Sequence, residues 1–194
     1  MNQRPRVVYS PAKIAAQVAR MGRAISKDYA GRTLDVVILL ENGFIFGADL
    51  VRRLSGPAVC HFVRVERHNV QIGGYDRTEI FFSHEPDLKG RHVLIVDTVL
   101  HSGVTMDFLI KRLLETRPRS LRIAVLLDKP HDRHVDLQPD YFGLCAASNY
   151  MVGYGLPGKH NLYRGLPYIG SFDRAPAASR RAARPARRKA KGKR

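Results

Sequence analysis

Apolar residues follow two patterns along this chain, continuous runs and helical spacing, and the two alternate. Continuous runs typical of buried strands occupy residues 34–40, 58–66, 92–97 and 121–127. Apolar residues at every third or fourth position predict helices over residues 11–30, 44–54 and 104–115. Strands that alternate with helices in this way predict an α/β fold with a twisted parallel sheet, flanked by helices on both faces and joined by right-handed crossovers.

Two regions fall outside this alternation. Residues 67–90 contain Gly73-Gly74 and an alternating stretch at 78–82, which predict a loop and a peripheral antiparallel strand. Toward the end of the chain, glycine and proline separate short aromatic-rich pieces at 141–145, 150–154 and 168–169. These pieces predict a small cap over one edge of the sheet.

The strand at 92–97 and the loop after it carry the strongest local chemical signal. Asp97 comes where the strand is expected to leave the core, at the edge where α/β sheets bind ligands. Ser102 and Gly103 allow a tight turn, and the backbone N–H groups at the start of the next helix favour an anion. The pattern therefore predicts a phosphate site, with an ordinary strand-to-helix connection as the alternative.

Basic residues gather at the end of the chain. The net charge is +16, but ten Lys/Arg and no acidic residue lie in residues 174–194, which leaves +6 for the remainder. Because aliphatic periodicity stops near Ser171, we expect a disordered basic tail over residues 173–194. Such a tail aids solubility or makes weak, salt-sensitive contact with nucleic acid, and no aromatic residues interleave its charges to stack on bases.

The composition predicts a globular protein of the cytosol. With 194 residues and 44% hydrophobic content, the chain can bury a core. Its apolar runs fall short of the roughly 18 to 20 residues that span a membrane, so we expect no membrane partner. Cys60 and Cys145 are isolated within apolar segments, which is typical of packed thiols in a reducing compartment.

A series of segments, in order along the chain, is similar to one known family: residues 25–31, 44–54, 90–97, 126–130, 139–143, 152–156 and 163–170. Through them the chain resembles the hypoxanthine-guanine phosphoribosyltransferases, of the type I phosphoribosyltransferase family. The resemblance implies a five-stranded parallel core with a small hood, in a domain that spans residues 1–172.

The resemblance also implies an activity. Members of the family transfer the ribose 5-phosphate of phosphoribosyl pyrophosphate to N9 of hypoxanthine or guanine, in purine salvage. Pyrophosphate leaves, and magnesium is bound. Relatives are oligomeric, so we expect a homo-oligomer. The partners would be phosphoribosyl pyrophosphate and a purine base or purine nucleotide.

By resemblance, the loop after the 92–97 strand holds the 5′-phosphate through Ser102, Gly103, Val104 and Thr105. Asp97 would face the ribose hydroxyls. His101 stands where the family places an aspartate near purine N7, and an imidazole can also carry a proton near neutral pH. No residue is assigned as a direct metal ligand, and Asp97 would act on a metal only through the ribose hydroxyls.

Other roles implied by resemblance fall on the later part of the chain. Lys129 would donate to the purine 6-oxo group, Tyr150 would stack on the base, and the backbone near Met151 would read its edge. Arg164 would meet pyrophosphate. The family's Lys-Gly pair, whose backbone helps hold pyrophosphate, is assigned to Asn42-Gly43.

Several positions depart from the family pattern. Thr98 replaces the second of two adjacent acids, and Pro157 replaces a magnesium-binding aspartate. The Ser-Tyr pair of the family's closing loop is replaced by residues 66–69. These losses fall on groups that hold metal, ribose and pyrophosphate, whereas the phosphate loop and the purine-reading residues remain.

Three functions therefore stay open. The first is a divergent purine phosphoribosyltransferase with His101 as proton carrier. The second is a non-catalytic paralogue that binds a purine nucleotide, or a related phosphorylated ligand, as a sensor or regulator. The third, and the least favoured, is RNA binding through the basic tail on an inert scaffold.

Overall fold

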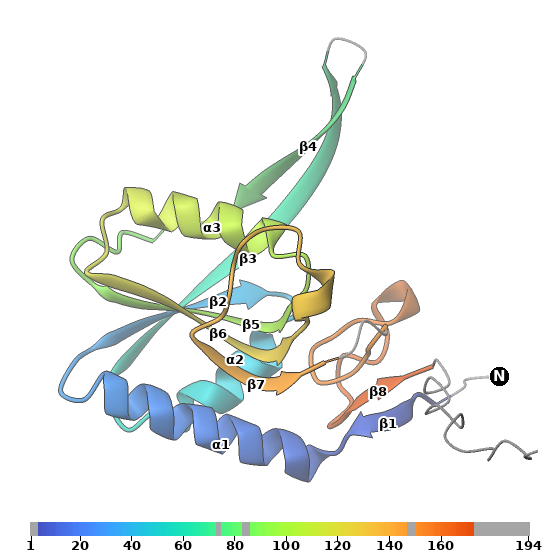
Figure 1. Cartoon of the computed structure of the whole chain (residues 1–194), viewed down its shortest axis with the longest axis horizontal. Helices are drawn as coiled ribbons and strands as arrows, with labels where there is room; N and C mark the ends of the chain where they lie inside the picture. Colours follow the sequence, from blue (N-terminus) through green and yellow to red (C-terminus); the bar gives the residue numbers. More distant parts are fainter. Residues whose placement is uncertain (1–3, 73–74, 83–85, 147–149, 173–194) are drawn as a thin grey trace, which may run out of the picture.

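The structure, a computed structural model, describes residues 4–72, 75–82, 86–146 and 150–172. Its centre is a six-stranded sheet in the order β4-β3-β2-β5-β6-β7 (Figure 1). All neighbours pair in parallel except β3 and β4. The strand bounds are β2 Leu34–Leu40, β3 Ala58–Ile72, β4 Tyr75–Phe82, β5 His92–Leu100, β6 Ser120–Asp128 and β7 Tyr141–Cys145. The predicted α/β fold with five parallel strands is confirmed.

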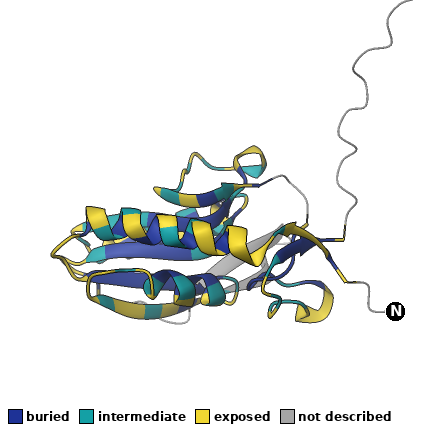
Figure 2. Ribbon diagram, turned by 90° about the horizontal axis from the view of Figure 1, so that it is seen from below, coloured by how far each residue is buried: buried dark blue, intermediate teal, exposed yellow. Residues whose placement is uncertain are grey.

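Helices cover both faces of this sheet. Helices α1 (Pro11–Asp28) and α2 (Phe44–Val51) pack on one face, and α3 (Val104–Glu115) packs on the other. In β5, Leu94 and Val96 point to the first face, while Val93 and Ile95 point to the second. Both sets are buried, which explains why the strands read as continuous apolar runs. Figure 2 shows exposed residues on the outer sides of the helices and buried ones toward the sheet.

The first helix begins and ends close to its predicted bounds. The Ser10 side chain accepts a hydrogen bond from the Lys13 N–H at 3.3 Å, and Pro11 occupies the first turn. The helix ends at Asp28, shortly before Gly31, whose φ of 71° lies in the left-handed region. None of the helices in the described ranges is long and apolar enough to cross a membrane.

The predicted cap lies beside the carboxyl ends of the parallel strands (Figure 1). One predicted part of it is wrong, because residues 141–145 form β7, which pairs with β6 in the central sheet. The cap contains the short helical turn η2 (Lys159–Asn161) and a two-stranded antiparallel sheet of β1 (Arg6–Tyr9) and β8 (Ile169–Ser171). We call residues 150–172 together with β1 the hood. The sequence does not predict β1, because its residues are mostly exposed and show no alternation.

Two strands are longer than the sequence predicts. The predicted loop after residue 66 is wrong in part, because β3 continues to Ile72 and pairs with β4 from Val65↔Phe82 to Ile72↔Tyr75. This pairing satisfies main-chain groups in a polar stretch that has no hydrophobic pattern. Strand β5 also continues past Asp97 to Leu100, which pairs with Asp128 of β6.

The two cysteines differ from expectation. Both are free thiols, but both are exposed rather than packed in the core. Cys60 lies on β3 before that strand meets β4, and Cys145 lies at the end of β7, so both are at the margins of the sheet. The predicted basic tail, residues 173–194, lies outside the described residues.

Two adjacent leucines of α3 test the packing of that helix. Leu113 is 1% exposed, whereas Leu114 is 52% exposed. We expect Leu113→Ala to lower the free energy of unfolding by about 3 kcal/mol, through lost transfer energy and the cavity left behind. Leu114→Ala should lower it by less than about 1 kcal/mol. Urea unfolding at equilibrium checks both values, and equal losses would contradict this packing.

Candidate functional site

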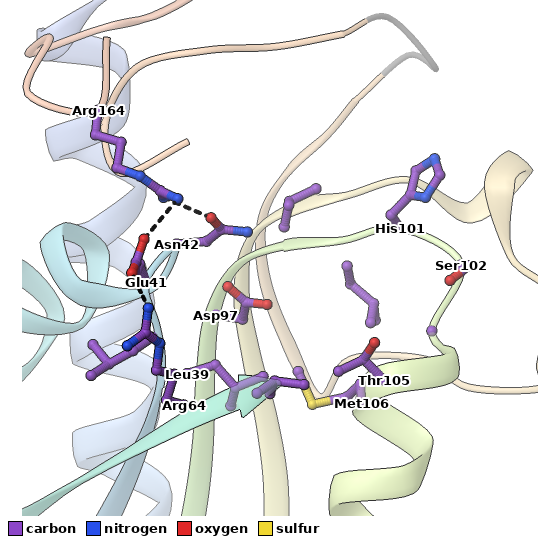
Figure 3. Close-up of a pocket in the computed structure, with 15 residues that line it drawn as sticks. Leu39, Glu41, Asn42, Arg64, Asp97, His101, Ser102, Thr105, Met106 and Arg164 are labelled. Carbon is purple, nitrogen blue, oxygen red and sulfur yellow. Dashed lines mark hydrogen bonds and ion pairs between the residues drawn. The ribbon is translucent and has the colours of Figure 1, made fainter. Parts of the chain in front are cut away.

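A cavity of about 550 Å³ opens at the carboxyl ends of β2 and β5, beside Arg64 and Val65 in the middle of β3 (Figure 3). Polar and charged side chains from four parts of the chain reach it, and several were predicted as site residues. The lining residues are Leu39, Leu40, Glu41, Asn42, Arg64, Val65, Asp97, Val99, Leu100, His101, Ser102, Gly103, Thr105, Met106 and Arg164. In an open α/β sheet, this edge is where ligands bind.

The loop between β5 and α3 has the geometry of an anion site. Gly103 caps α3 with a φ of 81°, and a Cβ there would lie 2.7 Å from Val135 Cγ2, so only glycine fits without displacing neighbours. Ser102 and Thr105 line the cavity beside the first turn of the helix, whose N–H groups and dipole favour negative charge. Val104 belongs to the same turn but does not line the cavity, and it is 43% exposed.

The segment after β6 holds this loop in place. Arg133 forms an ion pair with Asp128 and donates from Nη1 to the His101 carbonyl at 2.6 Å. The His134 N–H donates to the Ser102 carbonyl at 2.9 Å. These contacts are not predicted from the sequence, because nothing in the local pattern of residues 128–134 indicates that they pack against another loop.

Asp97 lies within β5 rather than at its end. Burial raises the pKa of its carboxyl to about 7, and hydrogen bonds from the backbone N–H groups of Thr98 and Val99 oppose this rise. The Thr98 N–H lies 2.7 Å from Asp97 Oδ1. Thr98 itself is buried, and its hydroxyl donates to the Asn42 carbonyl at 2.6 Å. The strand is therefore tied to the turn that follows β2.

His101 lies at the rim of the cavity and pairs with an acid. Its side chain is 59% exposed, and its Nε2 lies 3.1 Å from Asp132 Oδ2. Asp132 belongs to the helical turn η1 (Pro130–Asp132) and was not singled out from the sequence. A histidine oriented by a carboxylate is suited to carry a proton.

A cluster of charged groups occupies the opposite side of the cavity (Figure 3). Arg164 donates from Nη1 to Asn42 Oδ1 at 2.8 Å and to the Gly155 carbonyl at 2.6 Å. Its Nη2 lies 3.1 Å from Glu41 Oε2, and Arg64 Nη2 lies 2.9 Å from Glu41 Oε1. The structure thus brings the predicted Asn42 and Arg164 together.

Glu41 and Arg64 were missed by the sequence analysis, but a signal for them exists. Glu41 directly follows β2, and Arg64 is the register partner of Leu40 on β3, so both reach the same edge. The predicted Gly43 does not line the cavity. A Cβ on Gly43 would lie 2.6 Å from the Leu39 carbonyl, so its role in the structure is close backbone packing.

The three predicted purine-binding residues do not line this cavity. Lys129 is 7% exposed, and its backbone N–H donates to the Leu100 carbonyl at 3.0 Å. Burial lowers the pKa of its side-chain ammonium, and the nearby charge of Asp132 opposes this shift. Met151 is packed in the core. Tyr150 is 57% exposed, and its hydroxyl donates to the Pro157 carbonyl at 2.9 Å.

Metal-binding chemistry is sparse at this site. Within the described ranges, His, Cys, Asp and Glu side chains form no group of three or more that could hold a metal ion. The carboxylates that line the cavity are Glu41 and Asp97, and Glu41 is engaged by two arginines. A divalent cation here would depend on oxygen atoms supplied by a ligand.

Comparison with proteins of known sequence supports a family assignment. The phosphoribosyl transferase domain matches residues 8–157. The hypoxanthine-guanine phosphoribosyltransferase of Streptococcus pneumoniae is 34% identical over 169 residues, 87% of this chain and 93% of that protein. The hypoxanthine phosphoribosyltransferase of Salmonella typhimurium is 33% identical over 166 residues, 84% of this chain and 93% of that protein.

Solved structures agree with the sequence comparison. A hypoxanthine-guanine phosphoribosyltransferase from Bacillus anthracis has a TM-score of 0.78 and 27% identity, covering 88% of this chain and 99% of that one. A hypoxanthine phosphoribosyltransferase from Staphylococcus aureus has a TM-score of 0.77 and 30% identity, covering 85% and 89%. Since the matched domain spans most of the chain and includes every residue that lines the cavity except Arg164, the chain belongs to the type I phosphoribosyltransferase family, on its hypoxanthine-guanine branch.

Proposed function

We propose that the protein is a purine phosphoribosyltransferase of purine salvage, which transfers ribose 5-phosphate from phosphoribosyl pyrophosphate to N9 of hypoxanthine or guanine. The bond from the anomeric carbon to pyrophosphate breaks, a bond from that carbon to N9 forms, and the purine gives up a proton. One observation carries the proposal. A glycine-capped anion loop and an arginine cluster face each other across one cavity, in a chain 34% identical to a named enzyme of this activity.

The two ends of the cavity suit the two anionic ends of that substrate. Ser102, Thr105 and the N–H groups from Gly103 and Val104 onward would bind the 5′-phosphate. Arg164, with Asn42 and the backbone at Gly43, would bind pyrophosphate. Asp97 lies between these groups along the cavity lining and would accept hydrogen bonds from the ribose hydroxyls when it is ionised (Figure 3).

His101 would move the purine proton. As pyrophosphate leaves, positive charge develops on the ribose ring, and removal of a proton from the purine helps N9 attack. Asp132, 3.1 Å from the His101 ring, would hold the imidazole in one orientation and stabilise its cation. By resemblance, His101 stands where the family has an aspartate in this loop.

The purine would lie between the cavity and the hood. Lys129 would donate to the 6-oxo group, Tyr150 would stack on the ring, and the Met151 backbone would read its edge. Tyr150 is exposed and so is available for stacking. Lys129 is joined through its backbone to Leu100, which lines the cavity.

Magnesium fits this site as an ion shared with the substrate. Mg²⁺ is commonly held by one or two carboxylates together with substrate phosphates, and Asp97 would contribute through the ribose hydroxyls. Bound in this way, the ion would neutralise charge on the departing pyrophosphate. A homo-oligomer, a cytosolic location and weak nucleic-acid contact by the tail at 173–194 remain predictions.

The direct test is turnover. We expect the purified protein to form nucleotide and pyrophosphate from phosphoribosyl pyrophosphate and hypoxanthine, guanine or xanthine in the presence of magnesium. Product formation is followed by absorbance and chromatography, with calorimetric titration of IMP, GMP and guanosine tetraphosphate alongside. Nucleotide binding without product at high protein concentration would instead support a sensor.

Replacing His101 tests the proton transfer. His101→Ala should lower kcat by about 10² to 10⁴, because general acid–base catalysis contributes by that factor. Binding of ribose 5-phosphate should stay within about threefold, because the anion loop uses other groups. His131→Ala is the matched control, since His131 is exposed nearby and does not line the cavity. Equal loss of kcat in both variants would argue against a specific role.

The raised pKa of Asp97, about 7, predicts how stability depends on pH. The native state keeps the Asp97 proton at pH values where the unfolded state has lost it, so this group lowers the free energy of unfolding as pH rises from about 4 to 7. Asp97→Asn removes the effect. Between pH 4 and 7, the free energy of unfolding of the variant should therefore rise by about 2 kcal/mol relative to that of wild type. The full pKa shift would correspond to roughly 4 kcal/mol, but water in the cavity reduces the effect.

Urea unfolding of the ligand-free proteins at several pH values measures this difference. Asp107→Asn on α3 is the control, since the Asp107 side chain is 33% exposed and pairs with Lys111 away from the cavity, and it should show no comparable gain with pH. A gap between Asp97→Asn and wild type that stays constant from pH 4 to 8 would show that the Asp97 carboxyl is not held in its protonated form.

A further inference from the structure

A single carboxylate bridges two arginines inside the cavity. Glu41 Oε1 lies 2.9 Å from Arg64 Nη2, and Glu41 Oε2 lies 3.1 Å from Arg164 Nη2. The three residues come from separate elements: the turn after β2, strand β3 and the hood. All three line the cavity on the side away from the loop at 101–105 (Figure 3).

This arrangement is the one that a phosphate group would adopt. Guanidinium groups bind phosphate and carboxylate oxygens through the same charge-assisted hydrogen bonds. A carboxylate and a phosphate group can each place one oxygen on each of the two guanidinium groups. Glu41 therefore occupies the position at which an anionic group of a ligand would be held.

The cluster has one fixed member and one that can move. Arg164 is 19% exposed in its side chain and is held by the Asn42 side chain and the Gly155 carbonyl, neither of which depends on Glu41. The Glu41 side chain is 45% exposed, and the Arg64 side chain is 56% exposed. Glu41 can therefore turn toward solvent while the Arg164 guanidinium stays in place.

We propose that Arg64 and Arg164 form the second anion subsite of the cavity and that Glu41 is an internal competitor for it. An incoming anion must displace the Glu41 carboxylate, and this lowers its affinity. A ligand group with several negative charges, such as pyrophosphate, attracts the two arginines more strongly than the single charge of Glu41 does. It therefore displaces Glu41 more readily than a singly charged anion would. The subsite thus selects multiply charged anions. Naming its ligand as pyrophosphate rests on the proposed function, but the competition itself does not.

Glu41→Gln tests the competition, because it removes the charge and keeps the shape. With inorganic pyrophosphate as the probe in isothermal titration calorimetry, we expect Kd to fall about 10-fold, as for loss of two partly exposed ion pairs. Glu115→Gln is the matched control, since Glu115 is an exposed partner of Arg112 on α3, away from the cavity. Its Kd should stay within about twofold of wild type.

Two further measurements locate the effect. In the Glu41→Gln background, Arg64→Gln should weaken pyrophosphate binding about 10-fold, because Arg64 then contacts the ligand directly. Ribose 5-phosphate, which should bind the opposite loop, should keep its affinity in Glu41→Gln. Thermal unfolding of each variant confirms that the chain is folded.

The outcomes separate cleanly. Unchanged or weaker pyrophosphate binding by Glu41→Gln overturns the proposal, as does an equal gain in Glu115→Gln, which would reflect net charge alone. Failure to detect pyrophosphate binding by Glu41→Gln at millimolar concentration also overturns it. Tighter binding without any purine turnover would support the anion subsite and count against the transfer reaction instead.

Discussion

The parallel pairing of β2 with β5, covered on both faces, is the constraint on which the site depends. Apolar side chains fill most positions of both strands, so the polar groups of the cavity gather toward the carboxyl ends of these strands. The pairing runs from Leu34↔His92 to Ile38↔Val96. It therefore fixes the turn after β2 beside Asp97 and Thr98, and the Thr98 hydroxyl bonds directly to the Asn42 carbonyl. One register thus joins both sides of the cavity.

The sequence predicts the parts of the fold that repeat and misses those that depend on a partner. Continuous apolar runs and helical spacing predict four of the five parallel strands and the three helices, because each pattern is local. The fifth strand, β7, is short, and the sequence predicts it as part of the cap. The continuation of β3 to Ile72 depends on pairing with β4. Strand β1 depends likewise on β8, some 160 residues away in the chain. The local sequence of β1 or of the second half of β3 does not indicate which strand it will pair with.

The same distinction holds at the site. Asp97 and the loop at 101–105 can be found from residue types next to a strand end, and the structure places them on one cavity. Glu41 directly follows a predicted strand, but only the register of β2 and β3, which brings Leu40 opposite Arg64, places the two charged residues together. The supporting contacts of Arg133 arise from tertiary packing of a loop whose own sequence carries no strong pattern.

The placement of acids along the cavity bears on which ligand is bound best. Relative to the family pattern, the chain loses carboxylates beside the loop at 101–105, which we propose holds the 5′-phosphate, and has one carboxylate, Glu41, among the arginines at the other end. Fewer acids near the loop favour a ligand's monophosphate end, whereas an internal competitor disfavours the pyrophosphate end. If Glu41 competes as proposed, the free energy of binding shifts from the substrate toward the nucleotide product. Catalysis requires that the transition state be bound more tightly than the substrate or the product. Because the product would be bound more tightly than the substrate, slow product release would then limit turnover.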